Sequence, residues 1–335
     1  MNQQQTSIGR RRLLAAAGSA AGMAALASPA IAQSARLTAR VGVLVNDTHP
    51  STIAWRRFAQ LIADRTNRAV DVQIFPNSQL GGEREVAEGM RLGSIQGSTI
   101  NVAVLSSWVP EGQLFDMPFI FRDLDHAARV VAGPIGQALA EKYLQHGFRV
   151  LGYWNNGVRH PIGRFPINSP ADVRGKKMRV IQSPLHIELW TLLGANPTPI
   201  PAPEIYTSLQ TGVVDCFDNS KASYLALRFY EVARYFTDLG HIYGYGAFTF
   251  SEIFWRRLSQ AQQEIFRRTA AEVIAFQDNL AAFEDENALA RTVEMGAQVL
   301  RPERGPWVEV MRPFWERFAP QVGGMQAIQR VIDHA

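Results

Sequence analysis

The longest helical pattern in the chain lies between Ser259 and Gly296. No Gly or Pro occurs between these two residues, and aliphatic and aromatic side chains recur at helical spacing. One helix over this range would be roughly 55 Å long at 1.5 Å per residue, whereas a compact globule of about 300 residues is only about 50 Å across. Heptads are not sustained, which argues against a coiled coil. The helix must therefore cross the whole molecule.

A second pattern, in Lys176–Ser220, predicts a parallel sheet. Residues 177–181 and 213–217 are typical of strands, and two helical segments, which end at Gly194 and Gly212, lie between them. Two strands joined through helices are most simply parallel. Because 335 residues exceed one ordinary core, we expect an α/β fold with two lobes.

Arg179 and Asn219 lie at the carboxyl ends of these strands. Open parallel sheets collect ligands beyond that edge, because loops and helix N-termini meet there. An arginine offers a planar charged fork for a carboxylate or phosphate, and asparagine adds a neutral donor and acceptor. The pattern therefore predicts a site for a small anion. The alternative is that Arg179 makes a surface or interlobe ion pair.

The N-terminal segment has the features of an export signal. Arg10, Arg11 and Arg12 precede an apolar run of small residues, and Ala30-Ile31-Ala32 fits a cleavage site. The paired arginines favour the twin-arginine route. An amphipathic anchor that stays on the mature protein is the alternative. Without these three arginines the formal net charge falls from +4 to +1, so no basic surface suggests nucleic-acid binding.

The N-terminal half begins with a predicted βαβ unit. Apolar residues alternate at 37–45 and 70–74, which predicts two strands, and Ser51 is expected to cap the helix between them. A further helix opens at Glu83, where a carboxylate suits the positive end of the helix dipole. That capping role is the alternative to a role in binding.

Two further strands carry polar residues that are candidates for a site. Residues 99–105 are mostly apolar and predict a buried strand, in which Asn101 is either hydrogen-bonded in the core or directed at a cleft. Residues 148–154 predict another strand. The turn expected at Asn155-Asn156-Gly157 is interpreted as a crossing between lobes, with Arg159 just beyond it.

The segment before the long helix is predicted from weaker patterns. Residues 229–235 are expected to continue a helix, and 238–246 to form a loop that contains His241. A strand candidate follows at 247–250. These assignments place His241 on a connection rather than on a strand.

Common signatures of nucleotide and metal sites are absent from the sequence. It contains no Gly-x-Gly-x-x-Gly, Walker loop, His-Glu-x-x-His or Cys-x-x-Cys. The single cysteine, Cys216, excludes an internal disulfide and is expected to pack in the core. A nucleophile and base made of Cys216 with His241 or His160 is the alternative. We predict no cofactor and no metal.

Six segments, taken in order, carry a family resemblance. They are FPNSQLGG at 75–82, MPFIF at 117–121, NGVR at 156–159, GKKMRV at 175–180, GANPTP at 194–199 and EIYTSLQTGVVD at 204–215. With them, residues 37–330 resemble a solute-binding protein of the tripartite ATP-independent periplasmic (TRAP) transporters, the DctP-like family. The resemblance implies a two-lobed, type II-like periplasmic-binding-protein fold with a ligand cleft between the lobes and a long bridging helix.

The resemblance also implies roles for individual residues. In the family, the arginine at the position of Arg179 holds the substrate carboxylate in a bidentate pair, the one at Arg159 assists, and an asparagine falls on Asn219. Three further positions vary in role among members: Glu83 and Asn101, which fall where the first lobe contacts substrate, and His241, where a water-mediated contact occurs.

The sequence departs from the family pattern at two positions. Ala202 stands where members commonly have an aromatic residue, which leaves space for a bulkier or differently shaped acid. Phe217 replaces a glutamine and either supplies an apolar wall or faces the core. We count Phe217 and Trp154 among the candidate substrate-binding residues.

The resemblance leads to a complete set of expectations. Residues 1–32 form the signal, 33–156 plus about 245–284 form lobe I, and 157–244 plus about 285–335 form lobe II. The expected function is a periplasmic, monomeric solute-binding component that captures an organic acid and delivers it to membrane permease subunits. A periplasmic enzyme acting on a small carboxylic acid, or a binding protein that serves a sensor, is the alternative.

Overall fold

The computed structural model describes residues 36–334. The export signal predicted for residues 1–32 lies outside the described residues. Within the described range, no helix is both long enough and apolar enough to span a membrane.

Ten strands form the sheet in the described part of the chain. They are β1 Leu37–Gly42, β2 Val70–Phe75, β3 Gly97–Asn101, β4 Phe148–Gly163, β5 Lys177–Val180, β6 Asn196–Pro199, β7 Cys216–Asn219, β8 Tyr235–Thr237, β9 Ile242–Ser251 and β10 Gln298–Leu300.

The α-helices are α1 Pro50–Arg65, α2 Glu83–Leu92, α3 Val102–Leu105, α4 Leu124–Ala132, α5 Pro134–Gln145, α6 Pro184–Leu192, α7 Ile205–Gln210, α8 Lys221–Ala226, α9 Glu252–Trp255, α10 Gln260–Glu294, α11 Gly305–Phe318 and α12 Met325–Ile332. Short 3-10 helices are η1 Pro110–Asp116, η2 Pro170–Val173, η3 Ala202–Glu204, η4 Phe229–Glu231 and η5 Ala319–Val322.

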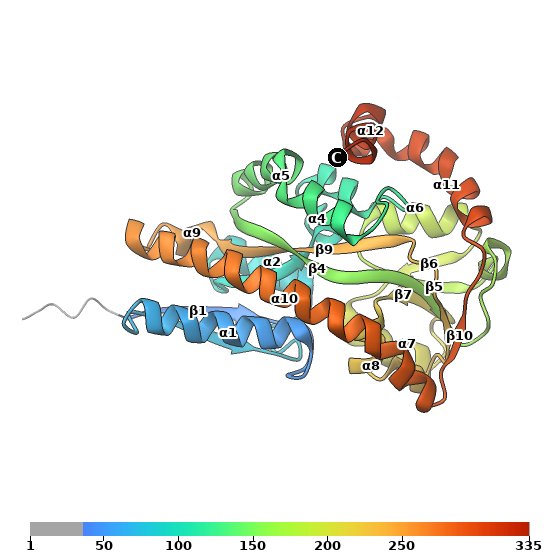
Figure 1. The fold of residues 1–335 in the computed structure, drawn as a ribbon, viewed down its shortest axis with the longest axis horizontal. Helices are drawn as coiled ribbons and strands as arrows, with labels where there is room; N and C mark the ends of the chain where they lie inside the picture. Colours follow the sequence, from blue (N-terminus) through green and yellow to red (C-terminus); the bar gives the residue numbers. More distant parts are fainter. Residues whose placement is uncertain (1–35, 335) are drawn as a thin grey trace, which may run out of the picture. The chain divides into compact units, whose positions relative to one another are not determined.

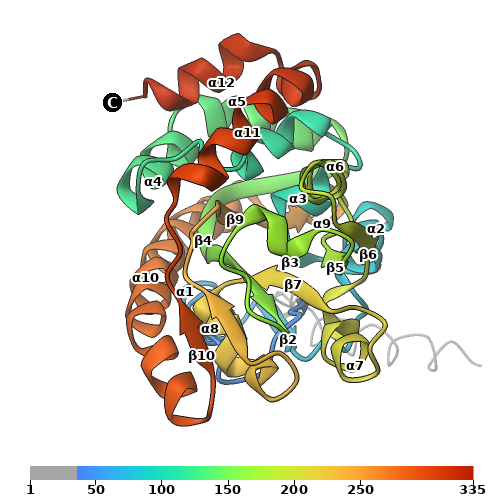
Figure 2. The ribbon, with the colours of Figure 1, turned by 90° about the vertical axis from the view of Figure 1, so that its right-hand side faces the viewer.

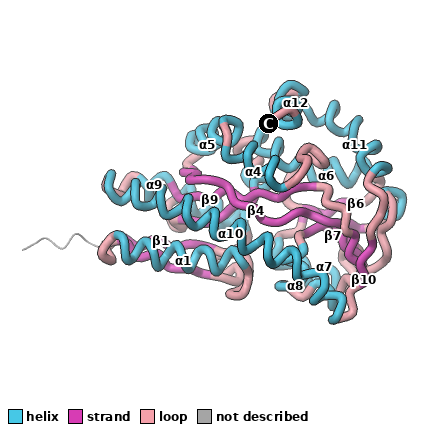
Figure 3. The backbone as a smooth tube through the Cα atoms, viewed as in Figure 1, coloured by secondary structure: helices cyan, strands magenta, loops and turns pink. Residues whose placement is uncertain are grey.

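The fold is α/β and two-lobed, with strands running through the middle and helices on both sides (Figure 3). One part of the sheet has the order β2-β1-β3-β9-β4, and the other continues as β4-β7-β5-β6. β1 and β2 pair in parallel, as do β5 and β7, which confirms both predicted parallel pairs. The carboxyl ends of these strands therefore form a shared edge.

β4 is the strand common to both parts of the sheet. The sequence predicted a turn at Asn155-Asn156-Gly157, and this is wrong, because β4 continues to Gly163 in antiparallel pairing with β9. The register shifts between Asn155 and Gly157, and Gly157 has a φ of +93°. Asn and Gly here form a bulge that lets one strand leave the first part of the sheet and enter the second.

The long helix is confirmed as α10, which has 35 residues. Ser259 caps it, and Gln262 completes a capping box. α10 packs on α1, on β4 and on α8, so it runs across both parts of the sheet (Figure 1). The lobe limits given above stay a prediction.

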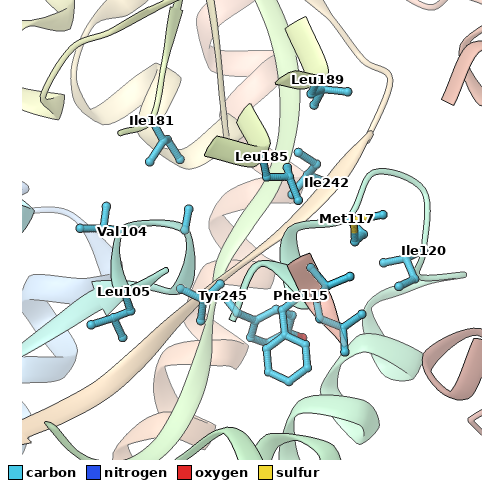
Figure 4. Close-up of a cluster of buried hydrophobic side chains, with 14 of the residues drawn as sticks. Val104, Leu105, Phe115, Met117, Ile120, Ile181, Leu185, Leu189, Ile242 and Tyr245 are labelled. Carbon is cyan, nitrogen blue, oxygen red and sulfur yellow. The ribbon is translucent and has the colours of Figure 1, made fainter. Parts of the chain in front are cut away.

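Three apolar clusters hold these elements together. The first joins α3, η1 and α6 with the C-terminal helices, and Figure 4 shows Leu105, Phe115 and Leu185 within it. Figure 2 shows α11 and α12 beside α4 and α5, where this cluster continues. The second lies between α1 and α10 and is aromatic, with Trp55 stacked on Phe248 at 4.1 Å between ring centroids. The third fills the space around β7 and α8.

Three local predictions are corrected. The strand expected at 99–105 ends at Asn101, and residues 102–105 form α3, because the Asn101 Oδ1 accepts a hydrogen bond from Ala103 N and caps that helix. α1 begins at Pro50 rather than after Ser51, with His49 as its cap. Residues 229–235 form only the single turn η4 before β8 begins.

Candidate functional site

A cavity of about 260 Å³ opens at the carboxyl ends of the parallel strands. Its walls come from elements on both sides of the β4 bulge. The lining residues are Gly42, Val43, Leu44, Val45, His49, Ser51, Trp55, Glu83, Thr99, Asn101, Asn156, Arg159, Arg179, Ile181, Ala202, Pro203, Ile205, Tyr206, Asn219, Ser223, Leu227 and Phe229. The volume is just below the roughly 300–1,000 Å³ of pockets for drug-sized ligands, so a small metabolite fits.

Arg179 is a buried cation in this cavity with little protein compensation. It extends from β5 and is only 4% exposed. Its Nε donates to the carbonyl oxygen of Ile200 at 2.8 Å, and among residues 36–334 no acceptor is found for its two terminal nitrogens. Burial and, to a smaller extent, the neighbouring Arg159 charge lower the pKa of Arg179 to about 10. The group is still charged near neutral pH and can accept an anion.

Arg159 is equally buried, but Asp218 neutralises it. Its Nε donates to Asp218 Oδ2 at 2.8 Å, and its Nη2 donates to Asp218 Oδ1 at 2.7 Å and to the Asp218 carbonyl at 2.6 Å. Burial alone would lower the pKa of Arg159, but the Asp218 charge and hydrogen bonds outweigh it and raise that pKa. The same pairing holds the pKa of Asp218 well below its usual range despite burial. Only Arg159 Nη1 is left for a ligand.

Asn219 completes this wall of the cavity. It is the last residue of β7, and its Oδ1 accepts a hydrogen bond from Ser220 N at 2.9 Å. β4 and β7 are antiparallel with Pro161 opposite Asp218, which brings Arg159 and Asn219 to the same edge. Two guanidinium groups and an amide therefore meet at one end of the cavity.

Glu83 and Asn101 form part of the opposite wall. Glu83 Oε1 accepts a hydrogen bond from Asn101 N at 2.8 Å. Burial raises the pKa of Glu83 to about 6, although this hydrogen bond and the charges of Arg179 and Arg159 oppose the shift. Glu83 lies in the first turn of α2, where its carboxyl suits the helix dipole. The same carboxyl also accepts the hydrogen bond from Asn101, the last residue of β3, so it does more than interact with the dipole.

Three predicted binding residues, His241, Trp154 and Phe217, do not line the cavity. His241 Nε2 lies 3.2 Å from Asp218 Oδ2, behind Arg159. Trp154 Nε1 donates to Asn156 Oδ1 at 2.9 Å. Phe217 is fully buried and packs edge-on against Phe229 at 4.9 Å between centroids, so it faces the core.

Several lining residues were missed by the sequence predictions. His49 and Ser51 follow β1 at the same carboxyl edge that identified Arg179, so that rule could have found them. Asn156 was interpreted as part of a turn. Trp55 carried no signal, because an aromatic residue on an apolar helix face is ordinary core, and here its ring does pack on Phe248. Ala202 also lines the cavity.

Cys216 is buried, burial raises the pKa of its thiol to about 12, and its sulfur contacts the Lys177 carbonyl. It is therefore not a thiolate near neutral pH. In the described part of the chain, no group of three or more His, Cys, Asp or Glu is arranged to hold a metal ion.

Comparisons with known proteins agree on one family. The family model DctP, "Bacterial extracellular solute-binding protein, family 7", matches residues 41–321. A solute-binding protein of Roseobacter denitrificans is 34% identical over 250 residues, which cover 74% of this chain and 76% of the relative.

Two solved structures are similar over most of the chain. A TRAP periplasmic solute-binding protein from Sulfurospirillum deleyianum with bound succinate has a TM-score of 0.86 at 31% identity, covering 90% of this chain and 100% of that one. One from Polaromonas bound to D-erythronate has a TM-score of 0.86 at 28% identity, covering 89% and 98%. The two related proteins thus hold different organic acids in the same fold.

Proposed function

This chain belongs to the DctP family of bacterial extracellular solute-binding proteins, family 7, and we propose that it captures an organic acid in the periplasm through Arg179 and delivers it to the membrane subunits of a TRAP transporter. The family and the similar structures are of TRAP solute-binding proteins that bind organic acids. The carboxylate pair and the delivery step are the proposal.

The observation that carries the proposal is the state of Arg179. A buried charge is costly unless it is paired, and the described residues supply no carboxylate within ion-pair distance of this guanidinium. A ligand carboxylate that accepts two N–H bonds from its terminal nitrogens supplies that charge. Arg159 Nη1 and Asn219 lie beside it and add donors.

Binding is coupled to closure of the two walls. Asn46 Nδ2 donates to the Ala226 carbonyl at 2.9 Å, and His49 Nε2 lies 3.4 Å from Ser223 Oγ. These contacts join the β1 side of the cavity to α8 on the other side. A ligand held by Arg179 and Glu83 at once contacts both walls only when they are together, so it selects the closed state. Closure also removes water and strengthens the carboxylate pair.

A ligand screen followed by substitution tests the proposal. A panel of organic acids is added to the purified protein, and a ligand that binds only the folded state raises its melting temperature. Arg179→Ala should then cost about 2–5 kcal/mol of binding free energy in calorimetry, the usual cost of truncating one partner of a desolvated pair.

The matched control is Arg301→Ala, because Arg301 is exposed and does not line the cavity. Its affinity should equal that of the unchanged protein. Equal affinity of the Arg179→Ala protein would refute the carboxylate pair. Chemical conversion of the bound acid would instead support the enzyme alternative, since a binding protein returns its ligand unchanged.

A further inference from the structure

The charges along the cavity wall are distributed unevenly. Of the described lining residues, Arg159 and Arg179 are the only Lys or Arg side chains. Both line the same cavity, and the Arg159 charge lowers the pKa of Arg179, which is consistent with two guanidinium groups that lie close together. Asp218 already balances Arg159. The cavity therefore offers one positive charge, that of Arg179, which has no ion-pair partner among residues 36–334. The Glu83 charge acts on it from beyond ion-pair distance.

The opposite wall offers hydrogen-bonding groups without a cation. Glu83 presents a carboxyl whose Oε2 has no hydrogen-bond partner among residues 36–334. Asn101 and Asn156 add amides, and Thr99 Oγ1 is fixed by a bond from Trp55 Nε1 at 3.0 Å. His49 also lies here, and burial lowers its pKa to about 4, which keeps the ring neutral. These groups accept from and donate to hydroxyls.

A second carboxylate on the ligand would weaken binding if it lay at this wall. It would lie near the Glu83 carboxyl in a water-poor space, where like charges repel more strongly than in water. It would find amides and a neutral imidazole, but no cation to replace its hydration. A ligand hydroxyl, in contrast, donates to the Glu83 carboxylate and satisfies it.

Another part of the cavity wall is apolar and leaves room for a carbon chain. Ile181, Leu227 and Phe229 line it, and Ala202 contributes only a methyl group. Such a wall suits the C–H face of a hydroxylated chain, while the polar wall faces its hydroxyls.

We propose that the cavity selects a monocarboxylate that carries several hydroxyl groups, with the carboxylate on Arg179 and the hydroxyls on Glu83, Asn101 and Asn156, and that it discriminates against dicarboxylates of the same length. This inference rests on the proposed function and narrows its ligand class. The relatives do not decide it, since one similar structure holds succinate and another D-erythronate.

The test uses ligands matched in chain length. Dissociation constants are measured by calorimetry at pH 7.5 for three four-carbon acids, D-erythronate, succinate and butyrate, and for three six-carbon acids, galactonate, adipate and hexanoate. In at least one of the two sets, the hydroxylated acid should bind tenfold or more tightly than both matched acids.

If at least one acid binds, but in both sets the dicarboxylate or the unsubstituted acid binds within tenfold of the hydroxylated acid, the inference is overturned and the proposed function still stands. Absence of binding for all six acids counts against the proposed function itself.

Glu83→Gln tests the residue on which the selection depends. Glutamine keeps the size of the side chain and the acceptor for Asn101 N, but it removes the charge that opposes a second carboxylate. The affinity ratio of the hydroxylated acid to the matched dicarboxylate should fall at least tenfold. Glu85→Gln is the control, because Glu85 is an exposed acid on the same helix that does not line the cavity. An unchanged ratio in the Glu83→Gln protein overturns the inference.

Discussion

Two buried arginines lie side by side in this protein, in regions built in opposite ways. In the Arg159 region, the guanidinium makes three hydrogen bonds to Asp218, and His241 supports the same carboxylate. In the Arg179 region, the guanidinium has a single bond to a backbone carbonyl. Asp218 raises the pKa of Arg159, whereas burial lowers that of Arg179 to about 10. One charge is compensated by the fold and the other is not.

The difference shows what a buried charge contributes in each case. The Arg159 pair is completed during folding, so it joins β4 to β7 whether or not a ligand is present. The Arg179 charge is held in place at a cost to the ligand-free protein. Binding proteins commonly keep such unfavourable groups where they act, at the expense of stability. We therefore expect substitutions in the first region to change stability and those in the second to change affinity.

The largest effect is expected for Arg159→Ala on the ligand-free protein. This change leaves Asp218 buried without its cation, which typically costs 3–5 kcal/mol. Arg179→Ala should cost less than about 1 kcal/mol, because it removes a charge that has no carboxylate partner in the described residues. Urea unfolding of both variants measures the difference. Equal losses of stability would show that the two arginines do not differ in their contribution to folding.

Arg179→Lys is expected to weaken ligand binding tenfold to a hundredfold. Lysine keeps the charge but loses the planar fork that binds a carboxylate through two N–H groups. Calorimetry with the ligand found in the screen measures the effect, and Arg301→Lys is the exposed control. If the lysine variant binds as tightly as the original, the Arg179 region works by charge alone, and the proposed geometry of the pair is wrong.

Much of the Arg179 region could be predicted from the sequence. Local patterns were enough for β5 and α6, because each has its own start or stop residue. They missed the short strand β6, which also pairs in parallel with β5, and they placed the strand β7 at 213–217 rather than at Cys216–Asn219. The rule that parallel strands gather ligands at their carboxyl ends then selects Arg179 and Asn219, and both line the cavity.

The Arg159 region could not be predicted in the same way. Its partner Asp218 is 59 residues away, and only the antiparallel register of β4 and β7 brings the two together. Because a turn was predicted before Arg159, no strand was expected there and its pairing with β7 could not be foreseen. An Asn-Gly pair forms a bulge as readily as a turn. The strand predicted at 99–105 was wrong beyond Asn101 for a related reason: the apolar run after Asn101 favours a strand, but residues 102–105 form a helix in the packed fold.

Glu83→Gln is expected to stabilise the ligand-free protein at alkaline pH, by at most about 2 kcal/mol. Burial raises the pKa of Glu83 from 4.5 to about 6, so the folded state binds this proton more tightly than the unfolded state. The resulting stability is complete below about pH 4.5 and is lost as the pH rises through about 6. One pKa unit corresponds to about 1.4 kcal/mol.

Thermal or urea unfolding at pH 4 and pH 8 measures this change in both proteins. The two should differ at pH 8 and agree at pH 4. A difference that is the same at both pH values would mean that folding does not raise the pKa of Glu83. A loss of stability in the Glu83→Gln protein at pH 8 would mean that the Glu83 charge compensates Arg179.

His241→Phe should have the smallest effect, a loss of about 1 kcal/mol or less in stability with no change in affinity. The hydrogen bond to Asp218 is removed, which usually costs more when the acceptor is charged. Two features limit the loss: Asp218 keeps its bonds to Arg159, and the unpartnered Nδ1 of the buried ring disappears with the imidazole. Phenylalanine also preserves the edge-on contact with Trp190.

Affinity is the more informative measurement on this variant, because the two possible roles of His241 predict different ligand affinities. If it only positions Asp218 behind Arg159, calorimetry gives the same dissociation constant for both proteins within about twofold. The family resemblance implies instead a water-mediated contact with substrate, and that contact would be lost with the imidazole. A tenfold weaker affinity at nearly unchanged stability would therefore show that His241 takes part in ligand binding and does not only support Asp218 behind Arg159.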